Sequence, residues 1–426
     1  MGGLSLGIDV GTSGVRTAVV DAAGQVVGTA RVPFPAQRSG PVDAEDWWRA
    51  VEGCLIRQIA ALEASGHNPK EIDRAAIDGT SGTMVLIDAD LKPVTQGLMY
   101  NSAGFDAEAD VIARFAPDNH ITRGSNSALA RMLRLQSEDP DRRARHVCHQ
   151  ADFVLARLIG TAGHSDDNNT LKLGFDPEAE RWPDWFEAAG VRTELLPNVH
   201  RIGQEVGEIS PEIAARLGLS TTLSLRAGTT DSIAAFLASG ASRVGDAVTS
   251  LGTTLAIKLL SDVRVDHAAQ GIYSHRLGDK WLAGGASNTG GGVLLGYFDA
   301  DRIAELSRRI DPTMPSGLDY YPLSKHGERF PINDPNLPPR LDPRPAEDHL
   351  FLQGMLEGIA TIEAACFVAL QQLGAPPPTR ILTAGGGAQN DVWTDIRRRI
   401  VSSNIEPSGE TEASVGMALL CLDHTS

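Results

Sequence analysis

The chain has 426 residues, of which 42% are hydrophobic and 22% charged, a composition typical of a globular enzyme with more than one domain. Its formal net charge of −16 argues against nucleic acid or an anionic membrane as the main partner. Four scattered cysteines, no basic-then-apolar start and no apolar run near 18 residues predict a cytoplasmic protein without a disulfide framework, zinc site or membrane span.

The first clear pattern is LGIDVGTSGVRTAVVD at residues 6–21, where alternating apolar residues predict two strands joined by a Gly-Thr-Ser-Gly turn. Asp9 ends the first strand, and a carboxylate there could hold hydrated Mg²⁺. The hydroxyls of Thr12 and Ser13, with the amides of the turn, could bind phosphate oxygens. Taken alone, a plain β-hairpin with a glycine-rich turn explains the pattern equally well.

Residues 42–66 have apolar positions at helical spacing and Asp43 able to cap the start, which predicts an amphipathic helix. The next segment, AAIDGTSGTMVLID at residues 75–88, predicts a strand, a second Gly-Thr-Ser-Gly turn and another strand. A repeated hairpin without a ligand would explain it. In the other interpretation Ser81, in this turn, lies near a hydroxylated substrate. The alternation of helix and strands favours a mixed α/β sheet.

Residues 100–227 carry weaker signals. Helical patterns cover residues 128–136, 150–160 and 208–220. The segment MYNSAGFD has several hydrogen-bonding side chains that could line a substrate cleft, although such residues are common in any loop. The polar stretch 164–177, with a histidine and two aspartates near its start, could suggest a metal site but is better interpreted as a solvated loop.

Residues 226–240, RAGTTDSIAAFLASG, predict a Gly-Thr-Thr turn that delivers Asp231 to the start of a helix. An ordinary acidic helix start would have the same pattern. A second strand, Gly-Thr-Thr turn and strand follow at residues 248–262. Two phosphate-type hairpins, one in each half of the chain, suggest a nucleotide held between two related domains. Asp231 lies between the hairpins along the chain, where a catalytic base at the domain junction is expected.

The second half continues with two strands joined near Gly278 and a glycine-rich loop that enters a helix at about residue 292. Residues 311–345 are rich in proline, aspartate and arginine without periodicity, and predict a long ordered surface excursion. Residues 351–375 predict a buried helix.

Residues 380–400 predict a strand, a triple-glycine turn and a helix, so that a ligand could lie against the backbone at Gly386 and Gly387. Asn390 and Trp393, one turn apart, could bind and flank a purine; in the alternative interpretation Trp393 lies in the core. A last helix of small residues begins near residue 411. The sequence has no GxxxxGK[ST] motif, no GxGxxG after a strand, and no HExxH, GxSxG or HRD motif.

In this order, the motifs LGIDVGTSGVRTAVVD, AGTTDSIAAF, SLGTTLAIKL and TAGGGAQN resemble those of the FGGY carbohydrate kinases, in the actin-like ATPase superfamily. The resemblance covers almost the whole chain. Three further segments, IDGTSGT, YSHRLGDKWLAGGASN and PSGLDYYPL, are more similar still to the short D-ribulose and xylulose kinase-like members of cyanobacteria and plants.

The resemblance implies an α/β fold of two ribonuclease H-like domains with a cleft between them. Residues 1–238, joined by the C-terminal helix 411–426, would form the sugar-binding domain, and residues 239–410 the ATP-binding domain.

The resemblance also implies roles for individual residues. Asp231 would be the general base at the sugar hydroxyl, and Ser81 would touch the sugar. Asp9 would contact the substrate and would organise the transferred phosphoryl group and, through water, Mg²⁺. Thr12 and Ser13 would bind phosphate oxygens. Asp231, Asp9 and Thr12 form the expected catalytic set. The remaining ATP-binding residues would be Gly252, Thr253, Gly386, Gly387, Asn390 and Trp393.

The sequence therefore predicts a kinase that uses ATP and Mg²⁺ to phosphorylate a small sugar. The expected sugar is a ketopentose, first of all D-ribulose, and the expected position is its terminal hydroxyl. The protein is expected to be a monomer or homodimer. D-xylulose or another pentose or polyol is an alternative substrate, because MYNSAGFD replaces the family's Trp-Asn-Asp-x-Arg type of sugar segment and the chain is shorter than most relatives. A non-kinase actin-like ATPase switch and a sugar-sensing binding protein are the alternative functions.

Overall fold

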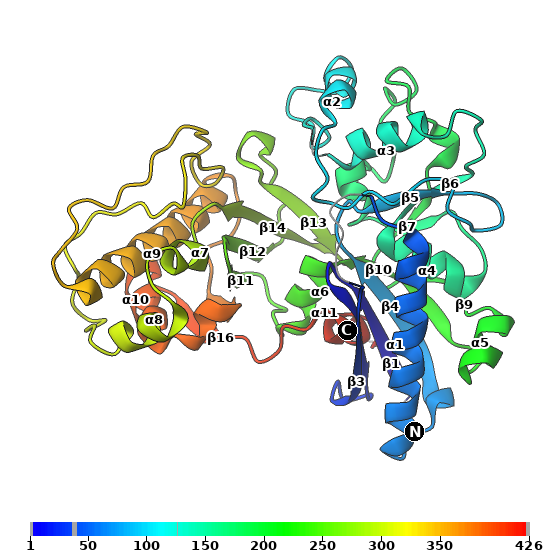
Figure 1. Ribbon diagram of the computed structural model, residues 1–426, viewed down its shortest axis with the longest axis horizontal. Helices are drawn as coiled ribbons and strands as arrows, with labels where there is room; N and C mark the ends of the chain where they lie inside the picture. Colours follow the sequence, from blue (N-terminus) through cyan, green and yellow to red (C-terminus); the bar gives the residue numbers. More distant parts are fainter. Residues whose placement is uncertain (1–2, 36–40, 126, 423–426) are drawn as a thin grey trace. The chain divides into compact units, whose positions relative to one another are not determined.

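The computed structural model describes residues 3–35, 41–125 and 127–422. The chain divides into two compact units, which are described separately (Figure 1). Unit 1 comprises residues 1–238 and 410–426, and unit 2 comprises residues 239–409.

Unit 1 is built on a six-stranded sheet with the order β3-β2-β1-β4-β10-β9. Strands β1, β4 and β10 are parallel neighbours at its centre, whereas β2, β3 and β9 run antiparallel to the strands they pair with. The strands are β1 (Leu4–Val10), β2 (Gly14–Val20), β3 (Val26–Pro33), β4 (Ile72–Gly79), β9 (Glu205–Glu208) and β10 (Ser224–Thr230).

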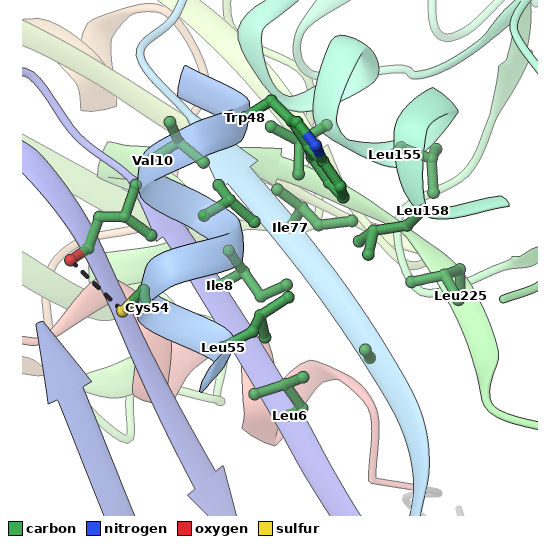
Figure 2. Close-up of a cluster of buried hydrophobic side chains, with 14 of the residues drawn as sticks. Leu6, Ile8, Val10, Trp48, Cys54, Leu55, Ile77, Leu155, Leu158 and Leu225 are labelled. Carbon is green, nitrogen blue, oxygen red and sulfur yellow. Dashed lines mark hydrogen bonds between the residues drawn. The ribbon is translucent and has the colours of Figure 1, made fainter. Parts of the chain in front are cut away.

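The main core of unit 1 forms where helix α1 (Ala44–Ala64) covers this sheet (Figure 2). Because side chains alternate along a strand, Leu6, Ile8 and Val10 of β1 all point to the α1 face. Trp48 of α1 packs there too, and full burial of each such side chain stabilises the fold by about 1.5–3 kcal/mol. Asp43 caps α1 by accepting the Glu45 N–H at 3.0 Å, as the sequence predicts.

The opposite face of the same strands carries the last helix, α11 (Ala413–Leu420), together with α6 (Asp231–Ala238). Gly7 of β1 lies so close to α11 that a Cβ atom would be 1.8 Å from the Ser414 carbonyl oxygen. Since Asp9 has the same parity as Gly7, its side chain is on this face, at the carboxyl end of β1.

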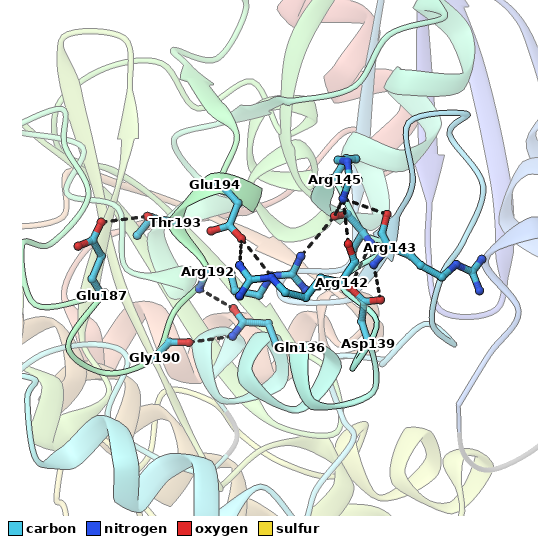
Figure 3. A network of polar contacts seen from close by, with 11 residues as sticks. Gln136, Asp139, Arg142, Arg143, Arg145, Glu187, Gly190, Arg192, Thr193 and Glu194 are labelled. Atoms are coloured by element: carbon cyan, nitrogen blue, oxygen red, sulfur yellow. Dashed lines mark hydrogen bonds and ion pairs between the residues drawn. The ribbon is translucent and has the colours of Figure 1, made fainter.

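The rest of unit 1 is a smaller layer of helices and short strand pairs around a second apolar cluster. Its polar contacts centre on Arg192, which donates to Asp139 at 2.8 Å and to Glu194 at 3.2 Å (Figure 3). The remaining elements of the unit are β5 (Met84–Ile87), α2 (Asp106–Ala113), α3 (Ala128–Ser137), β6 (His146–His149), α4 (Gln150–Ile159), β7 (His164–Asp166), β8 (Asn198–His200) and α5 (Pro211–Leu217).

Unit 2 has its own six-stranded sheet, with the order β13-β14-β12-β11-β15-β16. Strands β11, β15 and β16 are parallel, and β12, β13 and β14 complete an antiparallel half. The strands are β11 (Asp246–Leu251), β12 (Leu255–Ser261), β13 (Tyr273–Leu277), β14 (Lys280–Ser287), β15 (Arg380–Ala384) and β16 (Asn404–Pro407).

Helix α9 (Asp348–Gln372) supplies much of the unit 2 core, beside α7 (Gly291–Leu295), α8 (Ala300–Ser307) and α10 (Asp391–Val401). By length and composition α9 could cross a membrane, but 78% of its apolar stretch is buried inside the unit, as in the core helix of a soluble protein. Residues 311–345 contain no helix or strand, and Tyr320 and Phe330 from this excursion are buried in the core.

The two sheets share the same arrangement of their central strands. In each, an antiparallel hairpin (β1–β2 or β11–β12) is followed by a third antiparallel strand, and the first hairpin strand pairs on its other side with parallel strands. This order confirms the predicted α/β class with two ribonuclease H-like units. The two glycine-threonine turns, at residues 11–14 and 252–254, therefore occupy equivalent places.

The predicted strand, turn and strand at residues 75–88 are present as β4 and β5. The alternative of a repeated hairpin is wrong, because both edges of β4 are taken by β1 and β10, so that β5 pairs with β6. Gly228-Thr229-Thr230 is not a turn either: these residues end β10, directly before Asp231. Gly228 approaches β4 so closely that a Cβ atom would lie 1.7 Å from the Ile77 carbonyl oxygen, which only glycine allows.

Candidate functional site

Three aspartates meet at one edge of the unit 1 sheet. Asp9 on β1 is the register partner of Asp78 on β4, and Asp78 is in turn paired with Thr229 on β10. Asp231 begins α6 two residues after Thr229. Ligands of open α/β sheets bind outside the carboxyl ends of parallel strands, and these carboxylates stand at such ends.

Burial dominates the electrostatics of this group. Asp9 is 4% exposed and accepts a hydrogen bond from Arg16 Nη1 at 3.0 Å. Desolvation raises the pKa of Asp9, although Asp78 and the Arg16 guanidinium oppose the shift. Asp78 is fully buried, and desolvation, with the nearby charges of Asp9 and Asp231, raises its pKa well above the ordinary value.

Asp78 is a fully buried acidic side chain next to Asp9. Both of its oxygens are buried, and a hydrogen bond with the Asp9 side chain contributes to the raised pKa of Asp78. The motif at residues 75–88 by itself gives Asp78 no role. The missing signal was non-local, since only the β1–β4 pairing shows that it stands beside Asp9.

These carboxylates fit a hydrated Mg²⁺ better than a cation held by protein alone. Among the residues that the structure describes, no group of three or more His, Cys, Asp or Glu side chains could hold a metal ion. Mg²⁺ is usually bound through one or two carboxylates, with waters and substrate phosphates completing its shell. Asp9, at the carboxyl end of β1, meets that description.

The turn at residues 80–83 presents Ser81 at the same end of β4. The Oε1 atom of Gln150 accepts from the Thr80 N–H at 3.0 Å and from its hydroxyl at 2.8 Å, and Thr80 also contacts Thr83 at 2.6 Å. Ser81 Oγ is buried yet has no hydrogen-bond partner in the described part of the chain. The turn is thus held by its neighbours, while the Ser81 hydroxyl is a buried group to which these residues give no partner.

The segment MYNSAGFD lies against this turn. The Tyr100 N–H donates to Thr83 Oγ1 at 2.9 Å, and Arg131, which is buried on α3, donates to the carbonyl oxygens of Tyr100 and Gly82. Arg131 therefore ties the two segments that sequence analysis associated with the substrate. Burial lowers the pKa of Arg131 to about 10, so its side chain stays charged at neutral pH.

The prediction of a solvated loop at residues 164–177 is wrong for its first part. Asp166 and Asp167 are 3% exposed, and Asn168 and Asn169 are fully buried. Asn168 and Asn169 donate to Thr229 Oγ1 at 2.9 Å and to its carbonyl oxygen at 3.1 Å. This network holds the end of β10 directly before Asp231, and burial raises the pKa of Asp166 to about 6.

Unit 2 brings three glycine-containing segments together. The Gly291 N–H donates to the Gly252 carbonyl at 2.8 Å, and the Gly292 N–H to the Thr253 carbonyl at 3.1 Å. On the other side, a Cβ on Gly387 would lie 2.6 Å from the Leu251 Cβ. The β11–β12 turn is thus held between the start of α7 and the glycine turn after β15.

These segments line a cavity of about 570 Å³, within the usual size range of small-molecule sites. All six predicted ATP-binding residues of unit 2 line it, and most of its other walls are apolar. The lining residues are Leu251, Gly252, Thr253, Gly291, Gly292, Leu294, Leu295, Ala300, Ile303, Ala304, Ser307, Arg308, Gly386, Gly387, Gln389, Asn390, Asp391, Val392 and Trp393.

The side chains of Asn390 and Trp393 make hydrogen bonds within the protein that hold α10 in place. Asn390 caps α10 by accepting the Trp393 N–H at 3.0 Å, and its amide donates to Ser307 Oγ at 2.9 Å. Trp393 is 2% exposed, with its indole N–H donated to the Leu356 carbonyl at 3.2 Å. Trp393 therefore belongs to the core and contributes only an edge to the cavity wall, and its proposed contact with a purine stays a prediction.

The helix after the glycine-rich loop, α7, was predicted, but the part of the wall formed by α8 was missed. Ile303 and Ser307 of α8 line the cavity, and no helix was predicted at residues 300–307. The available signal was Asp299, a good N-cap that accepts the Arg302 N–H at 2.7 Å, followed by a short amphipathic stretch.

Gly386 and Gly387 offer a direct test for a ligand in this cavity. No atom lies within 4 Å of a Cβ placed on Gly386, whereas one on Gly387 would clash with Leu251 and Trp393. We expect Gly386→Ala to leave thermal stability unchanged but to weaken ATP binding at least several-fold, because only the ligand can meet the new methyl group. Gly387→Ala should lower stability by about 1–3 kcal/mol.

Thermal unfolding and nucleotide calorimetry of both variants check this expectation. Wild-type ATP affinity in Gly386→Ala would place the nucleotide away from this backbone.

The geometry defines an α/β protein of two ribonuclease H-like units, one with a carboxylate-rich strand edge and the other with a nucleotide-sized cavity bordered by glycines. Comparison with known proteins agrees. Residues 4–238 match the N-terminal domain model, and residues 247–422 the C-terminal domain model, of the FGGY family of carbohydrate kinases. The chain belongs to the FGGY family of carbohydrate kinases, and it is a phosphotransferase with an alcohol group as acceptor.

Individual relatives are distant but nearly full-length. The chain is 22% identical to the gluconokinase of Bacillus subtilis, over 98% of this chain and 86% of that protein, and 22% identical to the xylulose kinase of Escherichia coli, over 97% and 89%. Among solved structures, the xylulose kinase of Rhodospirillum rubrum has a TM-score of 0.85 at 19% identity, covering 98% of this chain and 89% of that one. At such identities the structural likeness shows the fold.

Proposed function

We propose that this carbohydrate kinase transfers the γ-phosphoryl group of ATP to the terminal hydroxyl of a ketopentose, with D-ribulose as the first candidate. The observation that carries the proposal is the meeting of Asp9, Asp78 and Asp231 with the partnerless Ser81 hydroxyl at one edge of the unit 1 sheet. In this proposal unit 1 binds the sugar, and unit 2 binds the nucleotide in its cavity.

Asp231 serves as the general base. Its position at the first residue of α6 favours the ionised form, since the helix N-terminus attracts negative charge. The Ser232 N–H donates to Asp231 Oδ1 at 2.6 Å, which helps to orient the carboxylate that accepts the hydroxyl proton. A carboxylate is a weak base, but phosphoryl transfer passes through a loose transition state in which proton removal can be late.

Asp9 and the turn after it bind the phosphate groups and the cation that neutralises their charge. Asp9 would hold hydrated Mg²⁺, and Thr12 and Ser13 would bind phosphate oxygens. When bound, Mg²⁺ neutralises charge that develops on the phosphate oxygens. In unit 2, Gly252 and Thr253 contact the phosphates, which is supported by their place on the cavity wall next to the start of α7.

The choice of sugar rests on Ser81 and the segment beside it. A hydroxyl without a protein partner suits an uncharged polyol, and Tyr100 and Arg131 place MYNSAGFD against the Ser81 turn. Relatives named as xylulose kinases make D-xylulose the nearest alternative, and those named as gluconokinases extend the list to sugar acids. In this proposal the protein acts in the cytoplasm as a monomer or homodimer.

A coupled ADP-release assay with ketopentoses, aldopentoses, polyols and gluconate tests the proposal. We expect turnover with D-ribulose to exceed that with every other sugar, and ATP hydrolysis without sugar to be at least about 10²-fold slower, because closed kinase sites exclude water. Faster turnover with D-xylulose or gluconate would contradict the choice of sugar. Turnover independent of any sugar would point to an ATPase switch, and tight sugar binding without ADP release to a sensor.

A further inference from the structure

Glu328, in the excursion at residues 311–345, is a buried carboxylate with an unusual number of donors. It is 3% exposed. Its Oε1 accepts from the Asn288 N–H at 2.7 Å and the Arg329 N–H at 2.9 Å, and its Oε2 accepts from Ser287 Oγ at 2.5 Å and the Tyr321 hydroxyl at 3.1 Å. Two of these donors belong to the glycine-rich loop at residues 287–292, about 40 residues earlier in the chain.

The excursion accepts further hydrogen bonds from this loop. Thr289 Oγ1 donates to the Pro322 carbonyl at 2.6 Å, and Asn288 Nδ2 donates to the Gly327 carbonyl at 2.9 Å. Burial and the adjacent Glu328 raise the pKa of Tyr321, so its phenol stays protonated and keeps its donor role. Side chains and backbone of the excursion thus form a brace on residues 287–289.

The braced loop is hydrogen-bonded to the β11–β12 turn, which lines the cavity. The Leu255 N–H donates to the Thr289 carbonyl at 2.6 Å, and the N–H groups of Gly291 and Gly292 donate to the carbonyls of Gly252 and Thr253. The β11–β12 turn is therefore held in place by the same loop that Glu328 anchors. Gly252, Thr253, Gly291 and Gly292 all line the cavity.

We propose that Glu328 is a positioning residue for nucleotide binding, and that the excursion at residues 311–345 is a brace that holds the phosphate-side turn of unit 2 through residues 287–292. Glu328 acts through these backbone groups and touches no reacting atom. The inference rests on the proposed binding of ATP in the unit 2 cavity.

Glu357 on α9 supplies a matched control. It is also a buried carboxylate that anchors the excursion, accepting from the Ser316 N–H at 3.0 Å and the Ser316 hydroxyl at 2.5 Å. It receives Arg399 Nη2 at 2.6 Å as well. Within the described part of the chain, its side-chain hydrogen bonds go to Ser316, Gln353 and Arg399 and not to residues 287–292, so its loss should affect stability without moving the turn.

The experiment compares Glu328→Ala, Glu328→Gln and Glu357→Ala in the full-length chain. The readouts are the melting temperature, ADP affinity by calorimetry without sugar, and the KM values for ATP and for the sugar that the wild type uses best. We expect both alanine variants to melt at lower temperature. Only Glu328→Ala should raise the KM for ATP and the Kd for ADP, by about tenfold, with the KM for sugar unchanged.

Glu328→Gln should recover most of the nucleotide affinity, because its amide oxygen can still accept the Asn288 N–H and its NH₂ group can donate to Ser287. Unchanged nucleotide affinity in folded Glu328→Ala, or an equal loss in Glu357→Ala, would overturn the inference. Absence of ADP binding in the wild type would instead contradict the proposed function, so the two failures are distinguishable.

Discussion

An Asp231→Asn variant is expected to lose sugar-dependent ADP release by about 10²–10⁴-fold while it binds nucleotide like the wild type. Asparagine has the same shape and can still accept the Ser232 N–H, which donates to Asp231 Oδ1 at 2.6 Å. The amide cannot take up the proton of the sugar hydroxyl, so only the chemical step should suffer. A coupled ADP-release assay measures the loss, and calorimetry with ADP measures nucleotide affinity.

Asp43→Asn is the matched control for this variant. Asp43 also stands at the start of a unit 1 helix, where it accepts the Glu45 N–H at 3.0 Å, but α1 covers the face of the sheet opposite to Asp9. We expect this variant to retain wild-type turnover. If Asp231→Asn stayed active within a few-fold of the wild type, the role of general base would have to be given to another group.

Glu363→Ala is expected to cost about 3–5 kcal/mol of the free energy of unfolding of unit 2. Glu363 and Arg397 form a fully buried ion pair, with Arg397 Nε and Nη2 each 2.7 Å from a carboxylate oxygen. Thr249 on β11 donates to Glu363 at 2.6 Å, and Arg397 donates to Thr383 on β15 at 2.7 Å. Removal of the carboxylate leaves the guanidinium charge buried without a counterion.

Chemical denaturation combined with amide hydrogen exchange on β11 and β15 measures this effect within unit 2. The double variant Glu363→Leu/Arg397→Met is the control, because apolar residues of similar volume remove both charges and should recover most of the stability. A loss below about 1 kcal/mol in Glu363→Ala would mean that water or another side chain compensates the arginine.

Hairpin turns and helix caps in this protein could be predicted from residues that lie close together in the sequence. The β1–β2 and β11–β12 hairpins, the Asp43 cap of α1 and the Ser210 cap of α5 were predictable, because turn geometry and capping depend on residues a few positions apart. The six cavity residues of unit 2 were also named in advance, since the glycine turns that carry them are local features.

Other features needed the folded chain. The sequence predicted strand character for residues 75–88 but could not show that β4 pairs with β1 and β10, which places Asp78 beside Asp9. The same limit applies to the buried polar residues Asp166 to Asn169, whose composition is that of a loop, and to Trp393, whose apolar surroundings come from α9. Burial is a sum over distant segments, so it is absent from any local pattern.

The amino-acid order of this protein thus determined its class, its two glycine-threonine turns and the aspartate at the start of α6, because each is written in a short motif. Only the tertiary structure decided which carboxylates share a strand edge, which helices wall the cavity and what the excursion at residues 311–345 holds. The physical reason is that parallel strand pairing and a four-donor carboxylate such as Glu328 join segments tens to hundreds of residues apart, and their positions become known only when the chain is folded.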